Sequence, residues 1–232
     1  MSKEKKIGIV GWKTGENSFG VTSPYLHYLS QFGEVEILMP QKGVVEGLDL
    51  LVLPGGLDLN PLNYGEVPGF YTSNQDVFKQ YFFDVNLKQY ISKNVPVFGI
   101  CLGFQQLCAL FGSKLTQDMV DAHPYSDPRY KLVHDVYKVE VVGEALSYKK
   151  TIGKDKKEKY DKFSVNSLHH QGVMIDNLSR DLTPLLIAHD YECVEAMKHN
   201  TLPVAGVQYH PEETWCDYAS DLILKLLNNG KD

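Results

Sequence analysis

The chain has 232 residues, of which 43% are hydrophobic and 22% are charged, and its formal net charge at pH 7 is -6. This length and composition suit one α/β domain with a full hydrophobic core, or at most two small domains, and a single domain over residues 1–232 is the prediction. The negative charge argues against non-specific binding to nucleic acid or to an anionic membrane. No apolar run approaches the length of a membrane span and no export signal opens the chain, so we expect a cytoplasmic protein.

The first half of the chain alternates apolar, strand-like segments with segments of helical periodicity. Strands are predicted at 6–12, 35–39, 48–53 and 96–100, and helices at 25–32, 76–93 and 104–111. The helix after the capping pattern Ser73-x-x-Asp76 is expected to bury Val77, Phe78, Tyr81, Phe82 and Val85. This alternation predicts a parallel sheet with right-handed crossovers, in which ligands bind at the carboxyl ends of the strands.

The second half has a different pattern, with strands joined by short turns. Strands are predicted at 133–142, 163–166, 182–189, 194–199 and 204–209, and a helix at 218–228. This half therefore adds an antiparallel region. The lysine-rich segment 149–162 is expected to be a solvated hairpin tip or flap, because its acidic residues and the lack of a basic–aromatic pattern disfavour a nucleic-acid role.

Cys101 has the sequence surroundings of a nucleophile at a strand-to-helix turn. It follows a strand-like run and precedes a helical one, with Gly99 and Gly103 two residues away on either side. Glycines are required where the bend leaves no room for Cβ atoms, and a helix N-terminus favours a thiolate. The alternative is a buried core cysteine between two glycines. The chain's four cysteines show no C-x-x-C pair and no metal-like spacing with histidine, so we expect free thiols and no metal.

Two further stretches could complete such a site. His210 follows an apolar strand, and Glu212, two residues on, would lie on the same side of an extended backbone. A thiolate nucleophile needs this kind of base with an orienting carboxylate, although a surface His-Pro-Glu turn is the simpler interpretation of the tripeptide alone. Gly55-Gly56, after a buried strand, indicates either a loop whose backbone closely approaches a ligand or an ordinary turn.

Several of these motifs together resemble the class I glutamine amidotransferases. The stretches that carry the resemblance are Gly99-Ile100-Cys101-Leu102-Gly103-x-Gln105, Gly206-Val207-Gln208-Tyr209-His210-Pro211-Glu212 and Pro54-Gly55-Gly56. The stretches 54–66 and 166–171 are similar to the γ-glutamyl-γ-aminobutyrate hydrolase branch, also called peptidase C26-like, whose members are stand-alone hydrolases. Leu102 departs from that branch, which usually has Arg after the nucleophile, and matches glutamine-hydrolysing domains.

The resemblance implies a flavodoxin-like three-layer α/β sandwich with a mostly parallel central sheet and a small antiparallel region. It implies a catalytic triad of Cys101, His210 and Glu212, an oxyanion hole made by the Gly56 and Leu102 backbone N–H groups, and no cofactor. The substrate-binding residues that it suggests are Gly55, Gln105, His169, His170 and Gln171. His169 and His170 could equally be buried, hydrogen-bonded loop residues, and His123 and His134 are expected to be structural.

Three functions remain open. The first is hydrolysis of a γ-glutamyl amide through a γ-glutamyl thioester, which releases glutamate and an amine. The second is a glutaminase subunit that delivers ammonia from glutamine to a separate synthase or ligase partner. The third is a non-catalytic binding protein on the same fold. The amine side of a substrate is expected near segments 57–71, 123–130 and 149–162, and the oligomeric state, a homodimer included, is left open.

Overall fold

The computed structural model describes residues 4–119, 132–142, 145–152, 158–188, 192–214 and 216–228. Its central sheet has the strand order β11-β7-β12-β13-β14-β6-β5-β1-β4, with β8 paired to β7. The strands of its first part are β1 (Lys6–Val10), β4 (Glu34–Leu38), β5 (Leu50–Leu53), β6 (Val97–Ile100) and β14 (Val204–Val207). Those of its second part are β7 (Leu132–Val142), β8 (Ala145–Tyr148), β11 (Lys162–Ser167), β12 (Leu182–Ala188) and β13 (Cys193–His199).

The parallel strands form the part of the sheet that positions the candidate site. β6 pairs in parallel with β5 on one side and with β14 on the other, so the carboxyl ends of these three strands lie next to one another. β11, β7, β12 and β13 pair antiparallel and extend the sheet beyond β14. The predicted α/β architecture, with a parallel sheet followed by an antiparallel region, is confirmed.

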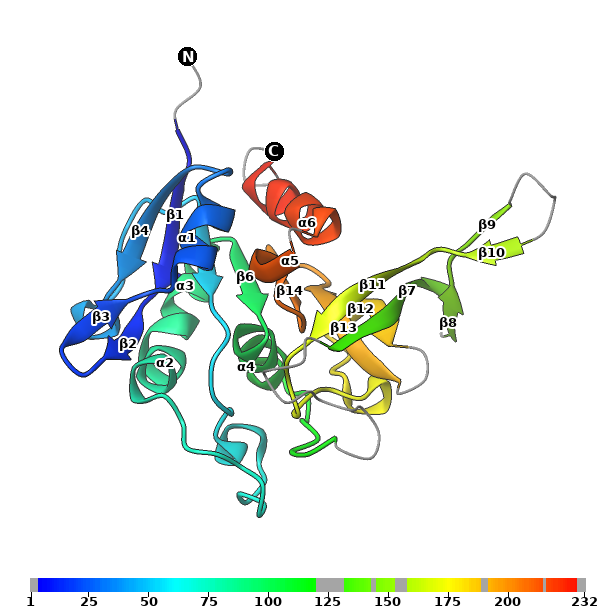
Figure 1. Ribbon diagram of the computed structural model, residues 1–232, viewed down its shortest axis with the longest axis horizontal. Helices are drawn as coiled ribbons and strands as arrows, with labels where there is room; N and C mark the ends of the chain where they lie inside the picture. Colours follow the sequence, from blue (N-terminus) through cyan, green and yellow to red (C-terminus); the bar gives the residue numbers. More distant parts are fainter. Residues whose placement is uncertain are drawn as a thin grey trace.

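Helices cover both faces of this sheet (Figure 1). One face carries α1 (Ser23–Leu29), the short α5 (Pro211–Thr214) and α6 (Asp217–Asn228), and the other carries α2 (Val77–Tyr81), α3 (Lys88–Ser92) and α4 (Leu102–Leu110). Strand β5 shows why two cores form, since its side chains alternate between the faces. Leu51 and Leu53 belong to the core under α4, whereas Leu50 and Val52 belong to the core under α1 and α6.

The helical run from α2 to α3 differs from its prediction. Asp76, not Ser73, is the N-cap, and its carboxylate accepts hydrogen bonds from the Phe78 and Lys79 N–H groups. A π-helical segment, Phe82–Leu87, separates α2 from α3 and shifts the buried face. Val77, Tyr81 and Val85, which were expected to be buried, are 73%, 42% and 43% exposed, whereas Lys79 is only 5% exposed.

One of the minor elements, a hairpin after β1, was not predicted from the sequence. β2 (Trp12–Gly15) and β3 (Ser18–Gly20) form a hairpin after β1. The lysine-rich segment forms the expected antiparallel pair, β9 (Lys150–Ile152) with β10 (Glu158–Tyr160). This pair lies at the outer end of an arm that projects away from α4, so the prediction that it lies near the site is wrong (Figure 1). Short 3-10 turns occur at Pro40–Lys42, Pro61–Tyr64 and Ile175–Asn177.

Candidate active site

Cys101 stands at the sharp turn between β6 and α4. It is the N-cap residue of α4, with φ 50° and ψ -104°, a backbone conformation that non-glycine residues rarely adopt. Its N–H donates to the Val207 carbonyl oxygen at 2.9 Å, and its own carbonyl oxygen accepts from the Gln105 N–H at 3.0 Å. The backbone is therefore held on both sides of the strained residue, as strained nucleophile turns require.

The glycines around Cys101 are required by close backbone packing. A Cβ at Gly99 would lie 2.6 Å from the Gly103 carbonyl carbon, and a Cβ at Gly103 would lie 2.2 Å from the Leu53 carbonyl oxygen. A Cβ at Gly206 would lie 2.8 Å from the Gly99 carbonyl oxygen. The predicted turn is thus confirmed, and its glycines allow α4 to begin directly against the ends of β5 and β6.

His210 connects Cys101 to Glu212. Its Nδ1 lies 2.6 Å from Glu212 Oε1, and Cys101 is near enough to its ring to act on its pKa. Burial alone would lower the pKa of His210, but Cys101 and Glu212 outweigh this effect and raise the pKa well above its usual value. The contact between His210 and Glu212 does not come from the same-side geometry of an extended strand that was expected, because Pro211 already begins the helical turn α5.

Two residues that the sequence analysis did not assign hold His210 in place. The side-chain amide of Asn166, at the end of β11, accepts from the His210 N–H and donates to its carbonyl oxygen, both at 2.8 Å. The Tyr25 hydroxyl, from α1, lies 3.5 Å from His210 Nδ1, and the nearby Glu212 carboxylate acts on its pKa. Burial, reinforced by Glu212, raises the pKa of Tyr25 well above its usual value, so the hydroxyl stays neutral.

The glycine loop after β5 passes directly beside this pair. A Cβ at Gly55 would lie 2.6 Å from His210 Cε1, and the Gly55 N–H donates to the Tyr25 hydroxyl at 2.9 Å. A Cβ at Gly56 would lie 2.9 Å from Leu102 Cδ2, which places the loop next to the start of α4. Leu102 is in the first turn of that helix, where backbone N–H groups have no intrahelical acceptor.

A buried amide network lies one turn further along α4. Gln105 Nε2 donates to the Gln171 carbonyl oxygen at 2.9 Å and lies 3.3 Å from Gln208 Oε1. His169 Nδ1 contacts the same Gln171 carbonyl oxygen at 2.9 Å. The Gln171 side chain is 1% exposed, and neither its Oε1 nor its Nε2 has a hydrogen-bond partner within the described part of the chain.

His169 and His170 have different surroundings. His169 Nε2 lies 3.6 Å from Glu195 Oε1, and His134 Nε2 lies 3.5 Å from the same oxygen. Burial would raise the pKa of Glu195, but the two histidines hold it well below the usual range. This buried cluster fits the structural role expected for His134, whereas His123 lies outside the described residues.

His170 is paired with carboxylates of the loops near the site. Its Nε2 lies 2.9 Å from Asp58 Oδ1 and its Nδ1 lies 3.6 Å from Asp118 Oδ1. The hydrogen bond to Asp58 raises the pKa of His170 despite its partial burial. Burial would raise the pKa of Asp58, but His170 lowers it. His170 therefore anchors the segment that follows the glycine loop.

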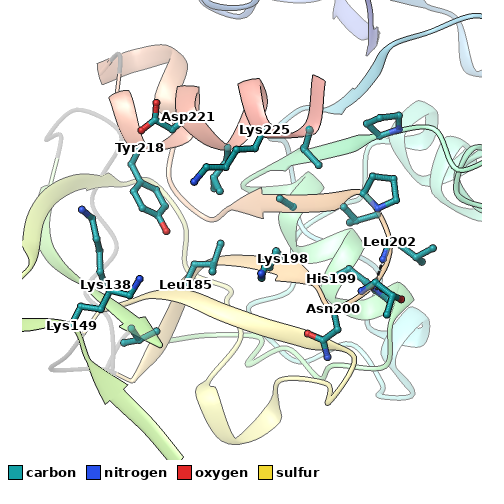
Figure 2. A pocket seen from close by; sticks show the side chains of 18 of the residues that line it. Lys138, Lys149, Leu185, Lys198, His199, Asn200, Leu202, Tyr218, Asp221 and Lys225 are labelled. Atoms are coloured by element: carbon teal, nitrogen blue, oxygen red, sulfur yellow. Dashed lines mark hydrogen bonds between the residues drawn. The ribbon is translucent and has the colours of Figure 1, made fainter. Parts of the chain in front are cut away.

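A cavity elsewhere in the molecule does not mark this site. It has a volume of about 720 Å³, and its lining includes Lys138, Lys198 and Lys225 (Figure 2). It also includes Pro203 and Val204, at the amino end of β14, whereas Cys101 and His210 follow carboxyl ends. Within the residues that the structure describes, no group of three or more His, Cys, Asp or Glu side chains could hold a metal ion, and no helix is long and apolar enough to cross a membrane.

Known proteins are similar to this chain in sequence and in fold. A family model described as Peptidase C26 matches residues 12–212. The glutamine amidotransferase-like protein YvdE of Lactococcus lactis is 27% identical over 213 residues, which cover 89% of this chain and 86% of YvdE. A component of the glutamine-hydrolysing GMP synthase of Thermococcus kodakarensis is 28% identical over 180 residues, which cover 76% of this chain and 82% of that component. The solved structure of PurLQS from Thermotoga maritima superposes with a TM-score of 0.59 at 16% identity, covers 99% of this chain and 100% of the matched chain, and shows the same fold.

Proposed function

The chain belongs to the peptidase C26 family of class I glutamine amidotransferase-like proteins, and from this premise we propose that it hydrolyses a γ-glutamyl amide at Cys101. The observation that carries the proposal is the position of His210, whose Nδ1 lies 2.6 Å from Glu212 Oε1 and whose pKa is raised by the nearby Cys101. A thiolate nucleophile beside an oriented base is the arrangement that acyl transfer needs.

The first half of the proposed reaction forms a thioester. Cys101 Sγ attacks the γ-carbonyl carbon of the substrate, and the carbonyl oxygen becomes an oxyanion. The Gly56 and Leu102 N–H groups are the proposed donors to that oxyanion, since the neighbouring Gly55 N–H is already engaged by Tyr25. The C–N bond then breaks, and His210 gives its proton to the departing amine or ammonia.

The second half releases glutamate. His210, now neutral, takes a proton from water, and the resulting hydroxide attacks the thioester carbonyl carbon. Collapse of this intermediate breaks the C–S bond and regenerates the thiolate of Cys101 beside protonated His210. Glu212 holds the ring orientation in both halves, and its contact with Nδ1 leaves Nε2 for the proton transfers.

The glutamyl head group is proposed to bind beside the buried amide network. Gln105 and Gln171 meet there, and the unpartnered side-chain amide of Gln171 offers both a donor and an acceptor. His169 contacts the Gln171 carbonyl oxygen in this network, and Gly55 lies beside His210, nearer to Cys101. His170, which follows β11, would act through its contact with Asp58 on the loop after β5. These assignments rest on the family resemblance and on this proximity.

A substrate panel tests the proposal. Purified protein is incubated with free glutamine and with a series of γ-glutamyl amines, and released glutamate is measured. We expect release from at least one compound and none above background for Cys101→Ala, because the thioester cannot form. A folded Cys101→Ala variant that keeps the wild-type rate would overturn the assignment, and inactivity of the wild type toward the whole panel would do the same.

A glutaminase subunit is the second candidate, favoured by a specific observation. Leu102 matches glutamine-hydrolysing domains, and one relative is part of a glutamine-hydrolysing GMP synthase. Under this alternative the partner would be a separate synthase that receives ammonia. Activity confined to glutamine, with a rate that rises when a co-purified synthase is added, would favour the alternative, whereas partner-independent cleavage of larger γ-glutamyl amides would favour the hydrolase.

A further inference from the structure

Lys79 is a buried cation beside the glycine loop with no part in the chemistry described above. It is 5% exposed, and its ammonium donates a hydrogen bond to the Gly55 carbonyl oxygen. The same ammonium lies 3.8 Å from the centre of a Trp12 ring, and a Cβ at Gly56 would lie 2.8 Å from it. Lysine is almost never buried this deeply without a specific partner, and the carbonyl of Gly55 is the acceptor that the structure provides.

The Gly55 carbonyl belongs to the same peptide unit as the Gly56 N–H. In a trans peptide the C=O and the N–H point in opposite directions, so a donor that fixes the carbonyl also fixes the N–H. Both flanking residues are glycines, which restrict rotation of this unit less than any other residue would. An external group is therefore needed to keep the unit in one orientation.

We infer that Lys79 is a positioning residue that holds the Gly55–Gly56 peptide so that the Gly56 N–H stays directed toward the oxyanion. The inference rests on the proposed function, in which Gly56 supplies one of the two oxyanion donors. A charge-assisted hydrogen bond to the carbonyl also polarises the amide, which makes its N–H a stronger donor.

The surroundings of Lys79 fit this role better than a role in stability. Burial lowers the pKa of Lys79 to about 8, although Asp76 and Cys101 act in the opposite direction. A buried charge costs free energy, and its replacement by an apolar side chain of similar shape is often neutral or stabilising. Loss of the ammonium should therefore affect catalysis without unfolding the protein.

The test compares Lys79→Met with Lys79→Arg and with Lys88→Met, a change at an exposed lysine on α3. For Lys79→Met we expect kcat to fall by about 10- to 100-fold and KM to change by less than about threefold. The reason is that the substitution affects the oxyanion hole and not the pocket for the glutamyl head group. Lys79→Arg should recover part of this loss, and Lys88→Met should match the wild type. Lys79→Gln, which is shorter and uncharged, provides the same comparison if Lys79→Met does not fold.

Alkylation of Cys101 by iodoacetamide separates positioning from an effect on the thiolate, since alkylation needs no oxyanion hole. We expect the alkylation rate of Lys79→Met to stay within about twofold of the wild-type rate. An unchanged kcat, a rise in KM alone, or alkylation that falls in parallel with kcat would each overturn the inference while leaving the proposed function intact. A wild type that releases no glutamate would overturn both.

Discussion

In the proposed reaction Glu212 acts only through His210, so it is the residue best suited to a pH experiment. The carboxylate helps to raise the pKa of His210, and the leaving group needs the protonated ring. For Glu212→Gln we expect kcat to fall about 100-fold or more and the high-pH limb of kcat/KM to move to lower pH, because His210 then loses its proton earlier. The pH–rate profile measures both effects. Glu213→Gln, at the exposed neighbouring position, is the matched control, and an unshifted limb in Glu212→Gln would contradict the assigned role.

The pair formed by His170 and Asp58 predicts a different pH dependence, in stability. The pKa of His170 is raised in the folded state, so the pair stabilises the fold fully below the unfolded-state value of about 6.5 and progressively less as pH rises through the folded-state value. Asp58→Asn should lower the His170 midpoint in an NMR titration. It should also reduce the free energy of unfolding more at about pH 6 than at about pH 9. An equal loss of unfolding free energy at both pH values would contradict a stabilising pair of His170 and Asp58.

The sequence alone predicts some residues of the site and not others, for a physical reason. Cys101 could be predicted because a glycine-flanked strand-to-helix turn is a local pattern in which backbone geometry and chemistry coincide. His210 and Glu212 could be predicted as a pair because they are close in sequence, although a helical turn and not an extended strand joins them. Tyr25 and Lys79 could not, because their roles depend on α1 and α2 packing against a loop distant in sequence. Asn166 was identified from the sequence only as part of a motif. Its role could not be predicted, because its contact with His210 joins the end of β11 to the end of β14.

At the scale of elements, the contact of α4 with β5 holds Cys101, the proposed nucleophile, in place. A Cβ at Gly103 would meet the Leu53 carbonyl oxygen at 2.2 Å, and backbone of a central strand cannot move aside as a flexible side chain can. Gly103→Ala should lower the free energy of unfolding by at least about 2 kcal/mol and abolish activity. Gly20→Ala is the control, because no atom lies within 4 Å of its Cβ position. Urea unfolding measures both, and a Gly103→Ala variant as stable as the wild type would contradict this packing.

The helical run 77–92 shows where pattern-based prediction of an element fails. Its apolar residues recur at helical spacing, yet the π-helical segment Phe82–Leu87 changes the rotation per residue and turns Val85 outward. The strands β1, β5 and β6 were predictable because fully buried parallel strands are continuously apolar. The hairpin of β2 and β3 was not, because Trp12–Gly15 is largely polar and partly exposed.

At the scale of the whole molecule, the sheet order explains how distant motifs meet. Cys101 follows β6, the glycine loop follows β5 on one side, and His210 follows β14 on the other. Alternating strands and helices predicted the parallel sheet, but the sequence does not encode which strands become neighbours in any local pattern. The antiparallel half places Asn166 and Gln171 beside the same edge, which no single segment could indicate.

The central claim is that a γ-glutamyl group becomes covalently attached to Cys101. The most direct measurement is intact-protein mass spectrometry after rapid acid quenching of a reaction with the best substrate of the panel, followed by peptide mapping. We predict an adduct of one γ-glutamyl group on the peptide that contains Cys101, accumulating in Glu212→Gln if thioester hydrolysis slows, and absent from Cys101→Ala. Glutamate release with no adduct at Cys101, or an adduct at Cys108, Cys193 or Cys216 instead, would contradict the account.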